Sequence, residues 1–322
     1  MPTPDQSFAS ESYHSRFGGM WIDRADFQHQ LAKRLSDGKI SPDTACAIRN
    51  FERDGFLILE GAAPDDDLVR FETAISTAFR NGHENLISQL PGSGSPQPVI
   101  AGMNRRGTRI VDSFAVLPSA LDLLCNPKLN RFMRCVFDEQ PLLFQSISFD
   151  MGSSQGIHQD TGYVVVNRPM EMLACWIALE NVRPGSGELQ YIVGSHRLPE
   201  FAFGGTRKHW NSQEDGIEAH EQWFKRILDE SRRRNFPTRS FMAKRGDILI
   251  WHADLAHGGA PITNPELTRK SLVGHYCPVS AEPYFMVVSP DRKAKLQYRD
   301  FSYASWHYDL AAISNTGEKT ST

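Results

Sequence analysis

Apolar residues in the first part of the chain recur at the spacing of helices. Phe27, Leu31 and Leu35 lie on one helical face, and Gly38 is placed to end the helix. The same periodicity and the local start signals predict helices over about 42–53, 119–125 and 127–137, a helix that begins near residue 65, and strands over 56–59 and 108–114. These helices are expected to pack on the outside of a sheet.

Residues 81–107 are predicted to form a loop, because their proline, glycine and serine segment has too few apolar groups for a core. This segment is interpreted as a connection, with a lid as the alternative. Arg105 and Arg106 are interpreted as a solvated basic turn, with contact to an anionic substrate as the alternative.

From residue 142 onward the pattern changes to short apolar runs separated by glycine-rich turns. Strands are predicted over 142–150, 163–166, 172–179, 188–193, 239–243, 247–252 and 269–276. Residues 200–238 form an insertion that holds one amphipathic helix. The number and spacing of the strands predict a mainly β protein with flanking helices, whose core is a double-sheet jelly roll of the cupin type.

Length and charge set the broad class. With 322 residues, 40% of them hydrophobic, the chain can bury a large core. The net charge of -3 gives no basic excess for nucleic acid or for a membrane surface. The N-terminus lacks an apolar signal region, and no apolar run approaches a membrane span. Five cysteines without paired spacing fit reduced thiols, so a cytoplasmic protein is expected.

The domain organisation follows from these patterns. We expect a disordered arm over 1–18, one domain over 19–314 and a disordered tail over 315–322. Within the domain, a helical part over 19–140 precedes the jelly-roll core over 142–290, which contains the insertion 200–238.

The candidate chemistry begins at His158 and Asp160. Two residues apart on an extended segment, their side chains share one face. An imidazole beside a carboxylate suits Fe(II), and a second histidine would complete the facial triad that leaves coordination positions open. This pair is weak evidence alone, because chance often produces it.

Two frames compete for the remaining ligand. His257 stands before two glycines at the end of the apolar run 247–252, and with His158 and Asp160 it leaves room for the intervening strands. The rival frame would use His252, Asp254 and His275. It is disfavoured because only 68 residues follow Asp254, too few for the rest of a jelly roll.

Arg269 and Ser271 open the strand that follows the last candidate ligand. The planar fork of arginine suits a carboxylate, and a hydroxyl two residues later shares its face. The pair is interpreted as a clamp for the distal carboxylate of a dicarboxylic co-substrate. The alternative is a salt bridge at the rim.

Taken in order, several motifs resemble the phytanoyl-CoA dioxygenase family of Fe(II)/2-oxoglutarate oxygenases, over roughly residues 45–285. The motifs are Phe51-Glu52-Arg53-Asp54-Gly55-Phe56, His158-Gln159-Asp160, Trp176-Ile177-Ala178-Leu179, Gly194-Ser195-His196-Arg197, Gly246-Asp247, His257-Gly258 and Arg269-x-Ser271. Departures are Gly187-Glu188-Leu189, where the family usually has a small residue or cysteine before the leucine, and a slightly long gap between His257 and Arg269.

The resemblance implies a double-stranded β-helix and a set of site residues. Iron would be held by His158, Asp160 and His257, and 2-oxoglutarate by Arg269 and Ser271, with Gln155 and Trp176 bordering its pocket. The co-reactants would be Fe(II), 2-oxoglutarate and O2, with ascorbate helpful in vitro.

The implied activity is hydroxylation of a C–H bond in a small molecule, with release of succinate and CO2. Acyl-CoA, amino acid and secondary-metabolite substrates all remain open. Asp160 favours hydroxylation, because related halogenases lack a carboxylate there. The alternatives are a non-catalytic jelly-roll binding module and a cupin-like metal enzyme without 2-oxoglutarate. The expected partner is a small molecule, with no nucleic acid or membrane, in a monomer or homodimer. The loops at 81–109 and 200–238 are expected to contact the substrate.

Overall fold

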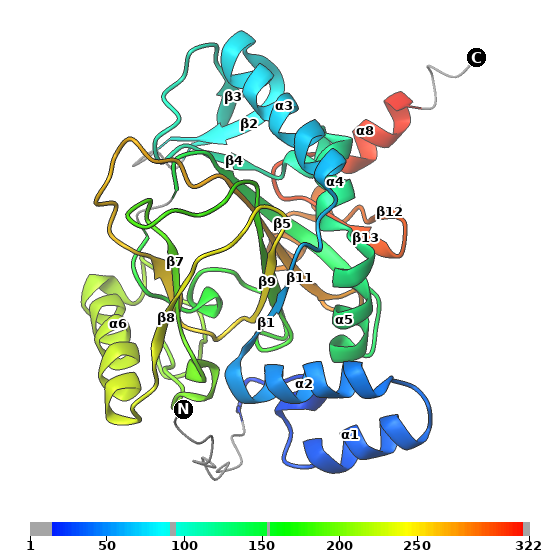
Figure 1. Ribbon diagram of the computed structural model, residues 1–322, viewed down its shortest axis with the longest axis vertical. Coiled ribbons are helices and arrows are strands. Elements are labelled where there is room, and N and C mark those ends of the chain that lie inside the picture. Colours follow the sequence, from blue (N-terminus) through cyan, green and yellow to red (C-terminus); the bar gives the residue numbers. More distant parts are fainter. Residues whose placement is uncertain (1–14, 91–94, 153–154, 318–322) are drawn as a thin grey trace.

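The computed structural model describes residues 15–90, 95–152 and 155–317. Two mainly antiparallel sheets form its core, flanked by helices (Figure 1). The large sheet has the order β1 (Phe56–Leu59), β9 (Ile248–His252), β6 (Leu173–Ala178), β11 (Ser271–Pro278), β5 (Pro141–Phe149), β4 (Arg109–Val111), β2 (His83–Gln89) and β3 (Gln97–Val99). Two further strands lie off this order: β13 (Phe301–Tyr303) pairs with β5 and with β12 (Leu296–Tyr298). The small sheet has the order β10 (His257–Gly259), β7 (Leu189–Ile192) and β8 (Thr238–Phe241). The predicted jelly roll with flanking helices is confirmed.

The helices lie on the outside of these sheets. They are α1 (Phe27–Ser36), α2 (Pro42–Asp54), α3 (Asp65–Asn81), α4 (Pro118–Leu124), α5 (Pro127–Phe137), α6 (Gly216–Arg233), α7 (Tyr284–Val288) and α8 (Leu310–Gly317). Helix α6 lies beside the small sheet, and α3, α4 and α5 lie on the opposite side of the molecule (Figure 1). Short 3-10 turns occur at Trp21–Asp23, Ser113–Ala115, Asp160–Gly162, Ser195–Arg197 and Pro290–Arg292.

Helix α2 shows how local signals fix an element. The Ser41 hydroxyl accepts a hydrogen bond from the Thr44 amide at 3.2 Å, and Pro42 occupies the first helical position. Gly55 ends the helix with a φ of 84°, a left-handed conformation that glycine adopts without strain. The chain then enters β1 directly, as the sequence predicts.

The side chains of β6 alternate between two hydrophobic cores of the protein. Leu173, Cys175 and Ile177 pack into the outer core together with residues of the flanking helices. Ala174 and Trp176 pack into the core between the sheets, because successive side chains of a strand point to opposite faces. Both faces are buried, so the strand reads in the sequence as a continuous apolar run.

Two predicted segments differ from the structure. Residues 163–166 form no strand, because the amides of Tyr163 and Val164 both bond to the Asp160 carbonyl and close a tight turn. Conversely, the predicted loop over 81–107 contains β2 and β3. Only Leu86 of β2 is a buried apolar residue, so the sequence gives this strand almost no hydrophobic signal.

The predicted terminal segments fall mostly outside the described residues. The arm over 1–18 overlaps them only from residue 15, and helix α8 extends to Gly317, three residues into the predicted tail. In the part of the chain that the structure describes, none of the helices has the length and apolar character needed to cross a bilayer.

Candidate metal centre

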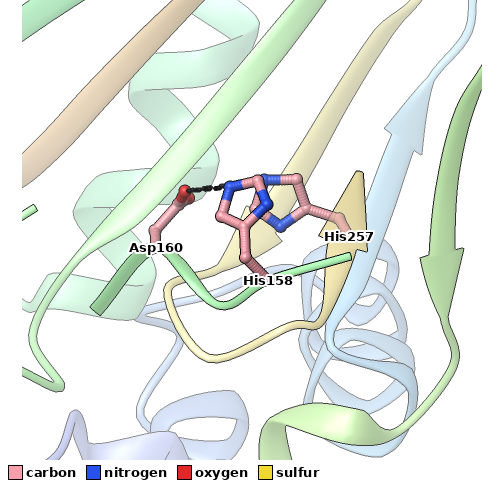
Figure 2. Close-up of side chains that lie close together, drawn as sticks. All are labelled: His158, Asp160 and His257. Atoms are coloured by element: carbon pink, nitrogen blue, oxygen red, sulfur yellow. Dashed lines mark ion pairs between the residues drawn. The ribbon is translucent and has the colours of Figure 1, made fainter. Parts of the chain in front are cut away.

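His158 and His257 are brought together by the backbone. The two residues form an antiparallel bridge, in which each amide donates to the other's carbonyl, at 2.8 and 2.9 Å. A side chain at Gly258 would place its Cβ 2.6 Å from the Gly156 carbonyl carbon, so glycine is needed where these segments cross. Asp160 follows at the start of a 3-10 turn, and its side chain points toward the two imidazoles (Figure 2).

The donor atoms of these three residues suit a metal ion. They lie within 4.8 Å of one another, and the Nε2 atoms of His158 and His257 are 3.7 and 3.5 Å from Asp160 Oδ1. Ligand atoms that share one ion at about 2 Å are typically about 3–4 Å apart. The residues therefore fit one divalent ion of the class that a 2-His-1-carboxylate set binds.

Backbone contacts fix which imidazole nitrogen is available. His158 Nδ1 lies 2.7 Å from the Gly156 carbonyl oxygen, and His257 Nδ1 lies 2.9 Å from that of Leu255. A carbonyl oxygen only accepts, so each Nδ1 carries the proton and donates it. The lone pairs of both Nε2 atoms are then free to bind a metal, as in histidine ligands whose other nitrogen is hydrogen-bonded.

The carboxylate is also oriented. Trp251 Nε1 donates to Asp160 Oδ2 at 2.7 Å, which leaves Oδ1 facing the histidines. Burial would raise the pKa of Asp160, but His257 and His275 more than offset it and lower this pKa below its usual value. Burial, with His257, lowers the pKa of His158 to about 4. The site therefore holds a charged carboxylate and a neutral imidazole, the forms that bind metal.

Three of the four other predicted site residues lie around the same space. Gln155, Trp176 and Arg269 line a cavity of about 800 Å³ that also reaches the three metal-binding side chains. Arg269 is only 2% exposed, and burial lowers the pKa of its guanidinium to about 10, so it stays protonated at neutral pH. Ser271 does not itself line the cavity, but it shares a face of β11 with Val273, which does. Its buried hydroxyl has no hydrogen-bond partner among the described residues.

The rival set does not form a metal site. Asp254 instead pairs with Lys208 Nζ at 2.6 Å and accepts a hydrogen bond from Thr161, and both members of the ion pair are almost fully buried. His252 Nδ1 accepts from the Asp254 amide at 3.1 Å. Within the described ranges, His158, Asp160 and His257 are the one group of three that meets the geometry of a metal site.

The Lys208–Asp254 pair ties the insertion to the turn that carries Asp160. Lys208 belongs to the insertion, and Thr161 directly follows the ligand. Trp223 of α6 also packs against Gly162 so closely that a Cβ there would collide with its ring. The insertion therefore supports the metal turn and cannot be treated as a detachable cover.

Lys208→Met is expected to destabilise the protein by about 3–5 kcal/mol, because it leaves the Asp254 carboxylate buried without its cation. Urea denaturation measures the free energy of unfolding. Lys225→Met, on the exposed part of α6, is the matched control and should change this free energy little. Adding Asp254→Asn should recover part of the loss. Equal effects of the two lysine substitutions would contradict the role given to this pair.

Sequence reasoning missed several residues of the cavity. Arg105 pairs with Asp150 at 2.7 Å and Arg106 donates to the Pro265 carbonyl, whereas Arg109 lines the cavity. Its guanidinium lies 6.0 Å from the ring of Phe149, the β5 residue that pairs with Ser271. Arg109, Trp210 and His220 lie in the segments 81–109 and 200–238 that were expected to contact the substrate, but the sequence did not single them out. Tyr163, which also lines the cavity, lies outside those segments.

Comparison with known proteins agrees with the fold and the site. The profile of the phytanoyl-CoA dioxygenase (PhyH) family matches residues 51–271, more than half of the chain. Peroxisomal phytanoyl-CoA dioxygenase of Homo sapiens is 20% identical over 254 residues, which cover 74% of this chain and 69% of that protein.

Solved structures show the same fold at low identity. The non-heme alpha ketoglutarate dependent carbocyclase SnoK from nogalamycin biosynthesis is 16% identical with a TM-score of 0.56, over 76% of this chain and 87% of that one. EctD from S. alaskensis, solved with 2-oxoglutarate and 5-hydroxyectoine, is 21% identical with a TM-score of 0.53, over 75% of this chain and 77% of that one. The family resemblance in the sequence is confirmed. The chain belongs to the phytanoyl-CoA dioxygenase family and is a non-heme Fe(II)/2-oxoglutarate-dependent dioxygenase.

Proposed function

We propose that this dioxygenase hydroxylates a C–H bond of a small molecule and converts 2-oxoglutarate and O2 to succinate and CO2. The observation that carries the proposal is the convergence of His158, Asp160 and His257 on a cavity that also holds a buried arginine. Bound Fe(II) would supply the oxidising chemistry, with 2-oxoglutarate as its electron source. The protein contributes binding, orientation and exclusion of water.

Arg269 is proposed to hold the distal carboxylate of 2-oxoglutarate. Its guanidinium lines the cavity and stays protonated at neutral pH, and its planar fork matches a carboxylate. Ser271, whose buried hydroxyl can donate to the same carboxylate, fits this role. Arg109 is a second cation near this end of the cavity, and we propose that it adds to the attraction for the dianion. Gln155 and Trp176 would border the co-substrate.

The carboxylate of Asp160 supports hydroxylation rather than halogenation. It occupies the position that a halide would need, and Trp251 and the two histidines hold it in place. Trp251 is 2% exposed, so the hydrogen bond that orients Asp160 is sheltered from competing water. We also propose that the enzyme is cytoplasmic and is a monomer or homodimer. It would act on small molecules and not on nucleic acid or membranes.

The proposed function is tested by succinate release. Protein supplied with Fe(II), 2-oxoglutarate and ascorbate should form succinate, and a panel of candidate substrates should contain compounds that raise the rate. Zn(II) in place of Fe(II) should give none. His257→Ala is the inactive control, because it removes one proposed ligand. A cupin-like enzyme without 2-oxoglutarate, or a binding module, would release no succinate under any of these conditions.

A further inference from the structure

The cavity extends well beyond the metal-binding side chains. Its volume of about 800 Å³ is in the range of pockets that bury a whole drug-sized ligand, and far more than a five-carbon dicarboxylate fills. The part away from Arg269 reaches the turn after Asp160 and the insertion 200–238, where Tyr163, Trp210 and His220 line it. This part is available to the prime substrate.

These three side chains form an aromatic wall. The ring of His220 packs against that of Trp210 in a tilted arrangement, with centroids 4.2 Å apart and planes at 34°. The Tyr163 ring lies 5.7 Å from His220 and 5.5 Å from His158, which joins the wall to the metal centre. Trp223, which is 2% exposed, packs behind Tyr163 and His220 and holds them from the side of α6.

Three of the four polar side-chain atoms of the wall are already hydrogen-bonded. The Tyr163 hydroxyl and His220 Nε2 are hydrogen-bonded to each other at 2.7 Å, and Trp210 Nε1 donates to the Gly216 carbonyl at 2.9 Å. The wall therefore presents mainly ring faces, with His220 Nδ1 as the one remaining polar side-chain atom of these three residues. Aromatic faces gain most from flat rings, which stack on them, or from cations.

Charge separates these two possibilities. Among the described residues that line the cavity, permanent charges occur only on Arg109, Arg269 and Asp160, and none belongs to the wall. Burial lowers the pKa of His220, which favours its neutral form. The undescribed internal segments 91–94 and 153–154 contain only proline, glycine and serine. Along the wall, a cationic substrate would lack a carboxylate partner, and the phosphates of a coenzyme A thioester would meet no basic side chain.

We propose that the prime substrate is an uncharged molecule with a flat, unsaturated ring system that lies against Tyr163, Trp210 and His220, and that it is not a coenzyme A thioester. This inference rests on the proposed function, because it assigns the remainder of the cavity to the substrate of that reaction. The wall orients the ring system of the substrate. Because Tyr163 of the wall contacts His158, one edge of the substrate lies toward the metal centre.

Matched ligands test this preference without turnover. Calorimetric titration of anaerobic enzyme loaded with Fe(II) and 2-oxoglutarate compares 2-naphthol with its saturated counterpart decahydro-2-naphthol, with 2-naphthoate and with decanoyl-coenzyme A. The flat neutral alcohol should bind about three- to tenfold more tightly than the saturated one, the gain expected from aromatic contact. It should also bind more tightly than the acid and the thioester.

Substitutions locate the preference on the wall. Trp210→Leu should abolish the advantage of 2-naphthol over the saturated alcohol, and Trp210→Phe should keep most of it. Trp306→Leu is the control, because Trp306 is exposed and its ring contact is with Phe285, which does not line the cavity. The inference is overturned if 2-naphthol shows no advantage or no binding, if the acid or the thioester binds more tightly, or if Trp210→Leu and Trp306→Leu act alike. Absence of succinate release would instead refute the proposed reaction, since binding is measured separately.

Discussion

Asp160→Ala is expected to abolish Fe(II)-dependent turnover and to weaken Fe(II) binding by more than about 100-fold. Changes to residues that only support a metal ligand typically cost about 10–100-fold in affinity, and loss of the anionic ligand itself should exceed that. Histidine binds a metal through its neutral imidazole, so the two remaining ligands would add no negative charge to offset the ion. Anaerobic equilibrium dialysis measures Fe(II) affinity, and the visible charge-transfer band of the enzyme with Fe(II) and 2-oxoglutarate should disappear.

Asp254→Asn is the matched control for this loss. It removes the other buried aspartate near the site but keeps its shape and part of its hydrogen bonding to Thr161 and Lys208. The protein should lose stability, while the Fe(II)-dependent band persists. His257→Ala should resemble Asp160→Ala. If the band survives loss of Asp160 and disappears with Asp254→Asn, the assignment of the metal centre is wrong.

The metal-binding residues could be predicted because their signals are local or follow the chain order. His158 and Asp160 lie two residues apart, and His257 follows the buried strand β9, which the sequence shows as an apolar run. The sequence does not show which contacts orient these side chains for metal binding. The Nδ1 contacts of the histidines and the hydrogen bond from Trp251 join groups that only the folded sheets bring together.

The residues that were missed depend on tertiary arrangement. Arg109 is distinguished from Arg105 and Arg106 only by the pairing of β4 with β5, which turns it toward the cavity. Tyr163 was assigned to a strand, because its apolar neighbours suggest one. The turn that closes on the Asp160 carbonyl instead brings its ring toward His220, 57 residues later in the chain.

The insertion illustrates a similar limit. Its length and amphipathic helix are visible in the sequence, and they suggest a segment laid over a finished core. In the structure it supplies Lys208, whose partner lies on the loop after β9, and Trp223, which packs on the turn of the metal ligand. Side chains of the insertion are therefore better probed one at a time than by deletion.

Arg269→Ala is expected to raise the KM for 2-oxoglutarate by more than about tenfold and to leave Fe(II) affinity largely unchanged. A charge-assisted hydrogen-bonded contact contributes about 1.5–3 kcal/mol, which corresponds to that factor. Burial lowers the pKa of the Arg269 guanidinium to about 10, so the cation is present at neutral pH. Steady-state succinate formation gives the KM, and dialysis gives the metal affinity.

Three further variants sharpen this test. Arg269→Lys should recover little, because an ammonium group cannot reproduce a bidentate contact. Arg109→Gln should raise the same KM by a smaller factor, since Arg109 is only half-buried and therefore more screened by solvent. Arg106→Ala removes an exposed cation that contacts the Pro265 carbonyl, and it should leave the KM for 2-oxoglutarate unchanged. An unchanged KM in Arg269→Ala would remove this arginine from the co-substrate site, and a larger rise in Arg109→Gln would transfer the main contact to Arg109.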